Sequence, residues 1–365
     1  MSPKICHLTS VHSLLDNRIF FKECMGLASN GFSVSLIAFG DESFEEIRDC
    51  VRLISLNVPV KNRLQRLIKR SKAVYQRALQ ENADIYHFHD PELLPVGLRL
   101  KKKGKKVVYD SHEDLPRQIF HKEYIPVFIK NQISMIVEPI ENYYVRRLDA
   151  VITVTDHIAK RFSKIAKKVI VCANYASLKE FDVVTEWGNN RDSICYVGGI
   201  SKLRGILELI DASKKVGVSL ELAGRFESKS LENQIIKVEN VNYNGFVNRN
   251  EIKPILSHCF AGVITFLPAP NHNFACPNKL FEYMASGIPV IASNFKDWKP
   301  IVEGNNAGLC VDPKNIESIS NAILYLKNNP KIAQQMGQNG RNAFEVNYNW
   351  QIEEKKLFTL YNELN

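Results

Sequence analysis

Short apolar runs, many of them β-branched, recur along the whole chain, and segments with helical spacing lie between them. The runs predict strands at 4–8, 33–38, 51–55, 85–87, 106–110, 150–154 and 169–171, and again at 194–197, 219–223, 241–243, 262–265, 290–292 and 308–311. The helical patterns cover 17–30, 92–103, 140–148, 156–165, 205–216, 228–238, 249–258, 277–286 and 315–328. Strands that alternate with helices predict parallel sheets covered on both faces.

A polar stretch without periodicity, 176–193, separates the two sets of predicted strands. We therefore expect an α/β protein with two doubly wound, Rossmann-like domains, at 1–175 and 176–349. An amphipathic helix at 350–364 follows them. In such sheets ligands bind beyond the carboxyl ends of the strands, so the strand–helix junctions carry the candidate chemistry.

The composition narrows the class of protein. The chain has 365 residues, of which 45% are hydrophobic and 24% charged, as in ordinary globular proteins. Its eight cysteines form no Cys-x-x-Cys pair, which argues against a zinc ribbon and against a disulfide framework. There is neither a signal-like start nor an apolar run long enough to span a bilayer. We expect a cytoplasmic protein.

The net charge of +9 is concentrated in the first half of the chain. In the segment 61–72, basic residues alternate with Leu64, Leu67 and Ile68, a pattern that suits an anionic membrane surface such as the inner face of the cell membrane. A solvated helix face is the alternative interpretation. Nucleic acid is not expected as a partner, because no basic platform with interleaved aromatic residues is present.

Two segments of the second predicted domain are candidate phosphate and sugar sites. After the strand at 194–197, Gly198 and Gly199 let backbone N–H groups approach an anion, and the cations Lys202 and Arg204 follow. The second segment is a helix entered through Pro277 and ended by Gly287. Its spacing puts Asn278, Lys279 and Glu282 on the polar side. A surface ion pair between Lys279 and Glu282 is the simpler interpretation of that side.

Titratable residues gather at strand ends of the first predicted domain. His112 and Glu113 follow the strand at 106–110, and His87, His89 and Asp90 lie at the end of the strand at 85–87. Two histidines and a carboxylate could hold a metal, but Asp90 turns away from the two rings, so the third ligand would have to come from elsewhere, and we expect no metal.

The loop after the first strand carries Ser10, Asp16 and Arg18. Arg18 at a helix start could meet phosphate. The alternative is an ion pair of Arg18 with Glu23 or Asp16.

These motifs resemble the family 4 glycosyltransferases, which are retaining enzymes of the GT-B fold, and the resemblance extends over nearly the whole chain. It is carried by Pro-Asn-Lys-Leu-Phe-Glu-Tyr-Met at 277–284 and by the glycine segment at 196–207. In the family, an acid at the position of Glu282 binds the ribose of a nucleotide-sugar. Two positions depart from the pattern: Phe274 replaces a second acid, and Gly199 replaces an arginine, while Arg204 stands where a lysine is usual.

The resemblance implies the roles of individual residues. The expected donor-binding set is Gly198, Gly199, Lys202, Arg204, Arg225, Phe246, Val247, Asn278, Lys279, Leu280 and Glu282. His112 would be catalytic, near the transferred sugar. The acceptor side would be formed by Ser10, Asp16, Arg18, His89, Asp90 and Glu113. By the same resemblance, the helix at 350–365 would pack back on the first domain.

We therefore expect a metal-independent glycosyltransferase, without a cofactor, that moves a sugar from a nucleotide-sugar to a lipid-linked or growing glycan. The acceptor would be a polyprenyl-diphosphate-linked glycan in surface polysaccharide assembly, and retention of configuration follows from the resemblance. A non-hydrolysing sugar-nucleotide epimerase and a non-catalytic nucleotide-sugar-binding subunit are the alternatives.

Overall fold

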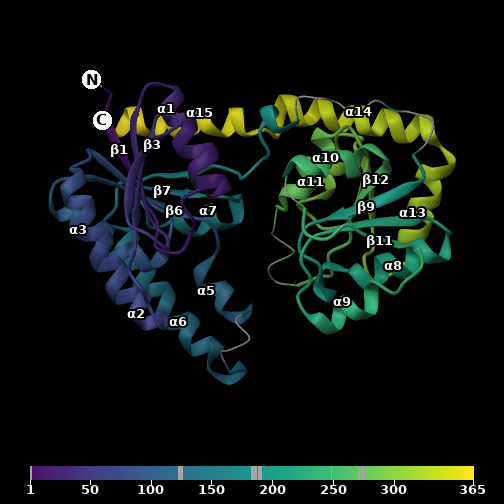
Figure 1. Cartoon of the computed structure of the whole chain (residues 1–365), viewed down its shortest axis with the longest axis horizontal. Helices are drawn as coiled ribbons and strands as arrows, with labels where there is room; N and C mark the ends of the chain where they lie inside the picture. Colours follow the sequence, from purple (N-terminus) through teal and green to yellow (C-terminus); the bar gives the residue numbers. More distant parts are fainter. Residues whose placement is uncertain are drawn as a thin grey trace. The chain divides into compact units, whose positions relative to one another are not determined.

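The computed structural model describes residues 2–121, 126–181, 187, 191–247, 249–269, 272 and 276–365. It divides the chain into two compact units, of which unit 1 contains Met1–Asn174 and Trp350–Asn365 and unit 2 contains Tyr175–Asn349 (Figure 1). The sequence analysis set the boundary after residue 175.

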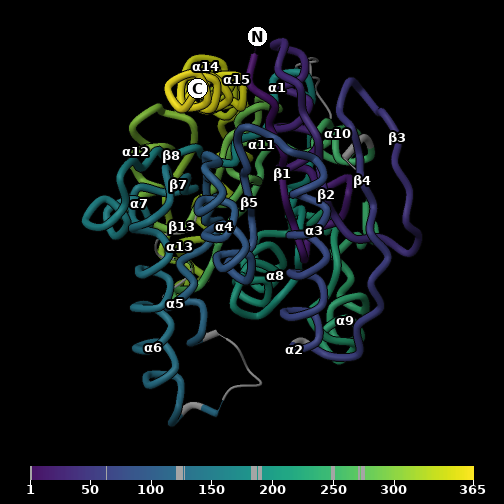
Figure 2. The backbone as a smooth tube through the Cα atoms, turned by 90° about the vertical axis from the view of Figure 1, so that its left-hand side faces the viewer, coloured from purple at the N-terminus to yellow at the C-terminus, as the bar shows by residue number. Residues whose placement is uncertain are grey.

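Unit 1 is a twisted sheet with helices on both faces. Its strands are β1 (Lys4–Leu8), β2 (Ser33–Phe39), β3 (Phe44–Arg48), β4 (Val51–Leu56), β5 (Ile85–Phe88), β6 (Lys106–Ser111), β7 (Ala150–Thr153) and β8 (Val169–Val171). They lie in the order β3-β4-β2-β1-β5-β6-β7-β8, and all neighbours are parallel except β3 and β4. Figure 2 shows β3 beside β4 at the sheet edge. The sequence analysis missed β3 because all its side chains are exposed, so no buried face marks it.

The helical segments of unit 1 are η1 (Asn17–Cys24), α1 (Met25–Ser29), α2 (Arg63–Gln65), η2 (Arg66–Arg70), α3 (Ser71–Glu81), η3 (Pro91–Leu93), α4 (Leu94–Lys102), α5 (Leu115–Gln118), η4 (Ile119–His121), α6 (Val127–Val145), α7 (Asp156–Phe162) and α15 (Trp350–Leu364). Helix α15 packs beside α1 and η1, and its Leu357, Leu360 and Tyr361 join the core on that face of the sheet (Figure 1).

Successive side chains of a strand point to opposite faces, and two separate cores result. In β1, Cys6 and Leu8 belong to the core on one face, whereas Ile5 belongs to the core under η1 and α15. His7 shares the face of Ile5 at the carboxyl end of β1. The imidazole of His7 thus occupies a position at which the alternation of side chains along β1 predicts an apolar residue.

Unit 2 repeats this architecture. Its strands are β9 (Ser193–Val197), β10 (Ser219–Ala223), β11 (Val241–Tyr243), β12 (Cys259–Ile264), β13 (Val290–Ser293) and β14 (Gly308–Val311), in the order β11-β10-β9-β12-β13-β14, with all neighbours parallel. The helical segments are η5 (Leu178–Phe181), η6 (Lys202–Arg204), α8 (Ile206–Lys215), α9 (Lys229–Ile235), α10 (Arg249–Ser257), α11 (Asn278–Ala285), α12 (Lys299–Val302), α13 (Ile316–Asn328) and α14 (Pro330–Asn347). The α/β fold class is as predicted.

Candidate active site

The end of β9 in unit 2 brings two cations against a pair of glycines. Gly198 has φ +125°, and a Cβ added there would lie 2.9 Å from Lys279 Nζ. A Cβ on Gly199 would lie 2.6 Å from Arg204 Nη1. The side chains of Lys279 and Arg204 therefore fill the space that larger residues would take. Glycine here is required both by the left-handed backbone at Gly198 and by this close approach.

Lys279 is the second residue of α11 and is only 7% exposed. Its Nζ lies 3.7 Å from the ring centroid of Tyr196 and 5.3 Å from that of Phe266. It has no hydrogen-bond partner among the residues that the structure describes. Burial, assisted by the charge of Arg204, lowers the pKa of Lys279 well below its usual value. The helical spacing predicts that Lys279 lies on the exposed, polar side of the helix. This prediction is wrong, because the glycine loop and two aromatic rings cover the side chain.

Arg204 ends η6, where its Nη1 donates to Gly199 O at 2.9 Å. The hydroxyl of Tyr196 donates to the same oxygen at 2.8 Å. The guanidinium is partly exposed, and its Cζ lies 5.5 Å from the Phe266 ring. If only the described residues are considered, this single hydrogen bond leaves most of its five N–H donors available to a ligand.

The other predicted donor residues differ in how they are placed. Lys202 is exposed, and its backbone N–H donates to Glu227 Oε1 at 3.0 Å. Arg225 stacks on the exposed ring of Phe246, with 4.2 Å between Cζ and the ring centroid. The side chains of Asn278, Glu282 and Val247 are half-buried.

Leu280 was expected to bind the donor, and this prediction has to be corrected. Its side chain is fully buried in the core of unit 2 and is not available to a donor. It lies on the apolar face of α11, which packs inward. Phe274 lies outside the described residues.

In unit 1, Arg18 is used inside the protein. It is 4% exposed; its Nε lies 2.9 Å from Glu23 Oε1, and its Nη2 donates to Asp110 Oδ2 at 3.0 Å. Of the two alternatives for Arg18, the structure shows the ion pair with Glu23. Segment η1 is a π-helix, in which residues five apart lie one above the other, and this geometry turns Arg18 and Glu23 to the same buried side. Its start is capped by Asp16, whose Oδ1 accepts from Arg18 N and Ile19 N.

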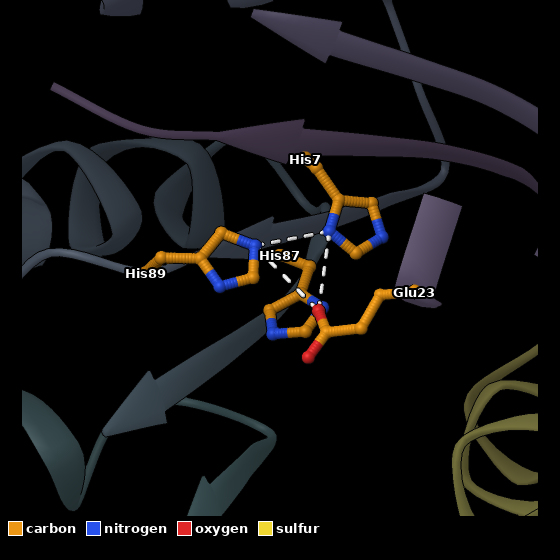
Figure 3. A group of neighbouring side chains, drawn as sticks. All are labelled: His7, Glu23, His87 and His89. Carbon is orange, nitrogen blue, oxygen red and sulfur yellow. Dashed lines mark hydrogen bonds and ion pairs between the residues drawn. The ribbon is translucent and has the colours of Figure 1, made fainter. Parts of the chain in front are cut away.

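Three histidines converge on Glu23 (Figure 3). Strands β1 and β5 pair with His7 opposite His87, and both rings point toward η1, as does that of His89 beyond the end of β5. Burial lowers the pKa values of His7 and His87 well below the usual range and that of His89 to about 4. Burial raises the pKa of Glu23 well above its usual value, against the opposing charge of Arg18.

His112 lies beside this cluster and is partly exposed. Its Nε2 is 3.2 Å from Asp110 Oδ2 and 3.3 Å from His89 Nδ1. Burial alone would raise the pKa of Asp110, but Arg18 and His112 hold it well below its usual value. A carboxylate therefore orients the ring of His112.

The remaining acceptor-side residues separate into buried and exposed ones. Asp90 is buried and accepts hydrogen bonds from Thr9 Oγ1 at 2.7 Å and Ser10 N at 2.6 Å, which fixes the loop after β1. Ser10 is also buried, whereas Glu113 is exposed.

Sequence reasoning missed the role of His7 and of Tyr361, whose hydroxyl lies 2.6 Å from His87 Nδ1. The sequence contains a signal for His7, because a histidine there occupies an inward-facing position of a buried strand.

Within the part of the chain that the structure describes, two groups of side chains could hold a metal ion: His7, Glu23, His87 and His89, and also His89, Asp110 and His112. Asp90, which the sequence pattern turns away from His87 and His89, belongs to neither group, and the carboxylates are those of Glu23 and Asp110. Among the described residues, no helix combines the length and apolar character needed to cross a membrane.

Two family models match the chain, and each covers most of one unit. The model described as "Glycosyltransferase Family 4" matches residues 18–175, and the model described as "Glycosyl transferases group 1" matches residues 179–343.

Curated relatives match over part of their length. An uncharacterized glycosyltransferase, MJ1178, of Methanocaldococcus jannaschii is 27% identical over 170 residues, which are 46% of this chain and 47% of that protein. The capsular polysaccharide biosynthesis glycosyltransferase CapM of Staphylococcus aureus is 28% identical over 180 residues, 48% of this chain and 47% of CapM. The chain thus spans about half the length of the curated relatives it matches.

Solved structures match over nearly the whole chain. Sucrose-phosphate synthase from Thermosynechococcus elongatus aligns with a TM-score of 0.78 at 18% identity and covers 99% of both chains. HepE from Anabaena, solved with UDP and glucose, aligns with a TM-score of 0.73 at 16% identity over 99% of this chain and 100% of HepE. At these identities the structures show the fold alone, which is GT-B. The two family models, which match residues 18–175 and 179–343, show that the chain belongs to the glycosyltransferases that they describe.

Proposed function

We propose that this chain transfers a sugar from a nucleotide-sugar to a lipid-linked or growing glycan in surface polysaccharide assembly, with retention of configuration. The observation that carries the proposal is the ammonium of Lys279, which is buried against Gly198 without a hydrogen-bond partner among the described residues. A buried cation without a partner is costly unless a ligand supplies the opposite charge. A diphosphate between Lys279 and Arg204 supplies it.

The same cations act on the transfer step. As the glycosidic bond to the donor breaks, negative charge develops on the departing nucleoside diphosphate. Fixed charges at this position, those of Lys279 and Arg204, stabilise it without reorganisation. Glu282 on α11 accepts from the ribose hydroxyls, and His112 is the catalytic residue that we propose in unit 1. The structure of HepE in complex with UDP-glucose supports the proposed donor class. The name of CapM, a capsular polysaccharide biosynthesis glycosyltransferase, supports the proposed pathway.

A panel of nucleotide-sugars with a polyprenyl-diphosphate-linked acceptor tests the proposal. Transfer, or slow hydrolysis of one donor, supports it. Interconversion of two free nucleotide-sugars would instead show an epimerase, and tight binding without turnover would show a binding subunit. Glu282→Ala should lower the affinity for the nucleoside diphosphate roughly tenfold or more, because two ribose hydrogen bonds to a charged group are lost. Glu282→Gln, which keeps the shape, should recover part of it.

We propose in addition that unit 1 binds the anionic membrane surface that carries the acceptor. Exposed apolar residues gather on the two segments α2–η2 and α6. They are Leu64, Leu67, Ile68, Phe128, Met135, Ile136, Ile140 and Tyr143. Exposed Lys69 and Lys72 flank the first segment, whereas Arg70 donates to Ser10 O at 2.9 Å and is not free for lipid.

Sedimentation with anionic vesicles tests this surface, since each basic residue near it contributes about 1 kcal/mol. Lys69→Glu with Lys72→Glu should reduce binding, and Met135→Glu with Ile136→Glu should reduce it independently. Exchange of the exposed pair Lys314 and Lys331 of unit 2 for Glu is the charge-matched control. Equal binding by all three proteins would contradict the proposed surface.

A further inference from the structure

The cluster of His7, Glu23, His87 and His89 has no part in the proposed transfer reaction. All four side chains are inaccessible to solvent, and they come from β1, η1 and the end of β5. Figure 3 shows that their polar ends converge on one point. Such an arrangement of imidazoles and a carboxylate in a protein interior requires an explanation, because buried polar groups are normally satisfied.

The spacing of the polar atoms is that of ligands around a small cation. His7 Nδ1 and His89 Nε2 form a hydrogen bond of 3.0 Å, which cation binding replaces, and Glu23 Oε2 lies 3.7 Å from the first and 3.8 Å from the second. A point in the plane of these three atoms lies about 2.1 Å from each, which is the length of a zinc–nitrogen or zinc–oxygen bond. His87 Nδ1 lies 3.9 Å from Glu23 Oε2, and the ligand atoms of all four residues lie within 4.8 Å of one another.

Outer partners hold these side chains in their orientation. The second ring nitrogen of His89, Nδ1, faces Asp110 Oδ2 at 3.5 Å, and the second oxygen of Glu23, Oε1, faces Arg18 Nε at 2.9 Å. Carboxylates behind metal-bound histidines are the usual outer shell of zinc sites. The hydroxyl of Tyr361 lies 2.6 Å from His87 Nδ1, and cation binding by this nitrogen replaces that hydrogen bond.

The charges and the hydrogen bonds of the cluster are incomplete as they stand. One guanidinium, that of Arg18, faces two buried carboxylates, those of Glu23 and Asp110. Among the described residues, neither Glu23 Oε2 nor the Nε2 atoms of His7 and His87 have a hydrogen-bond partner. A divalent cation at the point of convergence satisfies Glu23 Oε2 and supplies the positive charge.

We propose that His7, Glu23, His87 and His89 bind one Zn²⁺ ion. Three imidazole nitrogens and one carboxylate oxygen are a donor set that favours zinc over magnesium or calcium, and four protein ligands make a closed, structural site. The ion joins β1, β5 and η1. It plays no part in the sugar transfer, so it is compatible with a transfer step that needs no metal. The group of His89, Asp110 and His112 offers three ligands and shares His89, so the two groups are alternatives.

Metal content and cobalt spectroscopy test the site on the full-length chain. The protein is unfolded with a chelator, refolded in metal-free buffer and dialysed against ZnCl₂. We expect one zinc ion per chain, and with Co²⁺ the intense visible absorption of a four-coordinate ion. Glu23→Gln should weaken zinc binding by more than about 100-fold, because loss of an outer partner alone costs 10- to 100-fold.

Two control variants keep the test specific. His157→Gln removes a histidine from the surface and should leave the zinc stoichiometry at one. His112→Gln should also retain the ion, whereas its loss would assign the metal to the other group and overturn the proposal. If Glu23→Gln does not fold, the wild-type protein still decides. Absence of stoichiometric zinc, or a weak octahedral cobalt spectrum, would overturn the proposal, and neither result bears on donor binding by unit 2.

Discussion

Arg18 in unit 1 and Lys279 in unit 2 are both cations near a helix start, and both are buried, at 4% and 7% exposure. Their partners differ. Arg18 faces the carboxylates of Glu23 and Asp110 and donates to the backbone oxygen of Cys172. Lys279 faces two aromatic rings and a glycine, with no hydrogen-bond partner among the described residues.

This difference shows that burial of a cation does not by itself identify a binding site. A buried cation that already has its counter-charges stabilises the fold, and removing it leaves those charges unpaired. Within the described part of the chain, Lys279 has no counter-charge in hydrogen-bond contact, although the charge of Glu282 on the same helix opposes the lowering of its pKa. A buried cation of this kind lowers the stability of the free protein and gains a partner when an anion binds. The two residues should therefore respond in opposite ways to the same substitution.

The largest effect should follow from Arg18→Met. This variant removes the guanidinium but keeps much of its volume, and it leaves two buried carboxylates without their partner. We expect unit 1 to lose about 3–5 kcal/mol of stability. Denaturant unfolding followed by circular dichroism measures the loss, and hydrogen exchange should locate it in β1 and β5 and not in β9.

Arg52→Met is the matched control, because Arg52 is a half-exposed arginine of the same unit that pairs with Glu45. The buried Glu81, which Arg52 also contacts, keeps Lys4 as its partner in this variant. Its loss should cost no more than about 1 kcal/mol. If Arg18→Met were as mild as Arg52→Met, the ion pairs of Arg18 would not hold unit 1 together, and the contrast with Lys279 would disappear.

Lys279→Met should have the next largest effect, on binding and not on stability. The free energy of unfolding should stay within about 0.5 kcal/mol of the parent or rise, since an unpaired buried charge is removed. The affinity for a nucleoside diphosphate should fall by roughly 2–4 kcal/mol, about 30- to 800-fold. Isothermal titration calorimetry measures this loss, and the affinity for the bare nucleoside should not change. An equal loss for nucleoside and diphosphate would contradict a phosphate contact.

The fold could be predicted from the sequence because its strands are buried and short. Strands β1, β8, β10, β11 and β14 and helix α15 have the bounds that the apolar pattern predicts. The exposed strand β3 and the helix α14 were missed. Strand β3 presents no apolar face, and α14 contains Gly337 and Gly340, which disfavour a helix when the sequence alone is considered.

The candidate site was predictable in part. Glycines and cations at the end of a strand indicate an anion site, and this pattern grouped Gly198, Gly199, Lys202 and Arg204, whereas Lys279 was predicted from the separate helix at 277–286. Periodicity could not show that Lys279 is buried, because aromatic residues distant in sequence, Tyr196 and Phe266, cover it. The convergence of His7 with His87 and His89 depends on which strands are neighbours, and this follows from topology and not from local pattern.

The pH dependence of diphosphate binding should sharpen the comparison further. Burial and Arg204 lower the pKa of Lys279 in the free protein, and a bound anion should raise it again. Affinity is then highest below the pKa of the free protein and falls as the pH rises above it, by up to about tenfold per pH unit, or 1.4 kcal/mol. Titrations between about pH 7 and about pH 10 measure the slope. Lys279→Met should lack it, and the same slope in this variant would assign the proton to another group.

The smallest effect should come from Arg225, a cation of the same region that is exposed and stacked on Phe246. Because its charge is solvated in the free protein, Arg225→Met should lower diphosphate affinity by only about 0.5–1 kcal/mol, roughly two- to fivefold. This loss should vanish in about 1 M salt, because exposed charges more than about 3 Å apart are then largely screened from each other. The loss of affinity in Lys279→Met should persist. Calorimetry of both variants at low and high salt measures the two effects. Suppose that Arg225→Met lowered the affinity at high salt as much as Lys279→Met does. A buried cation without a hydrogen-bond partner would then bind the diphosphate no more strongly than an exposed one, and the comparison would fail.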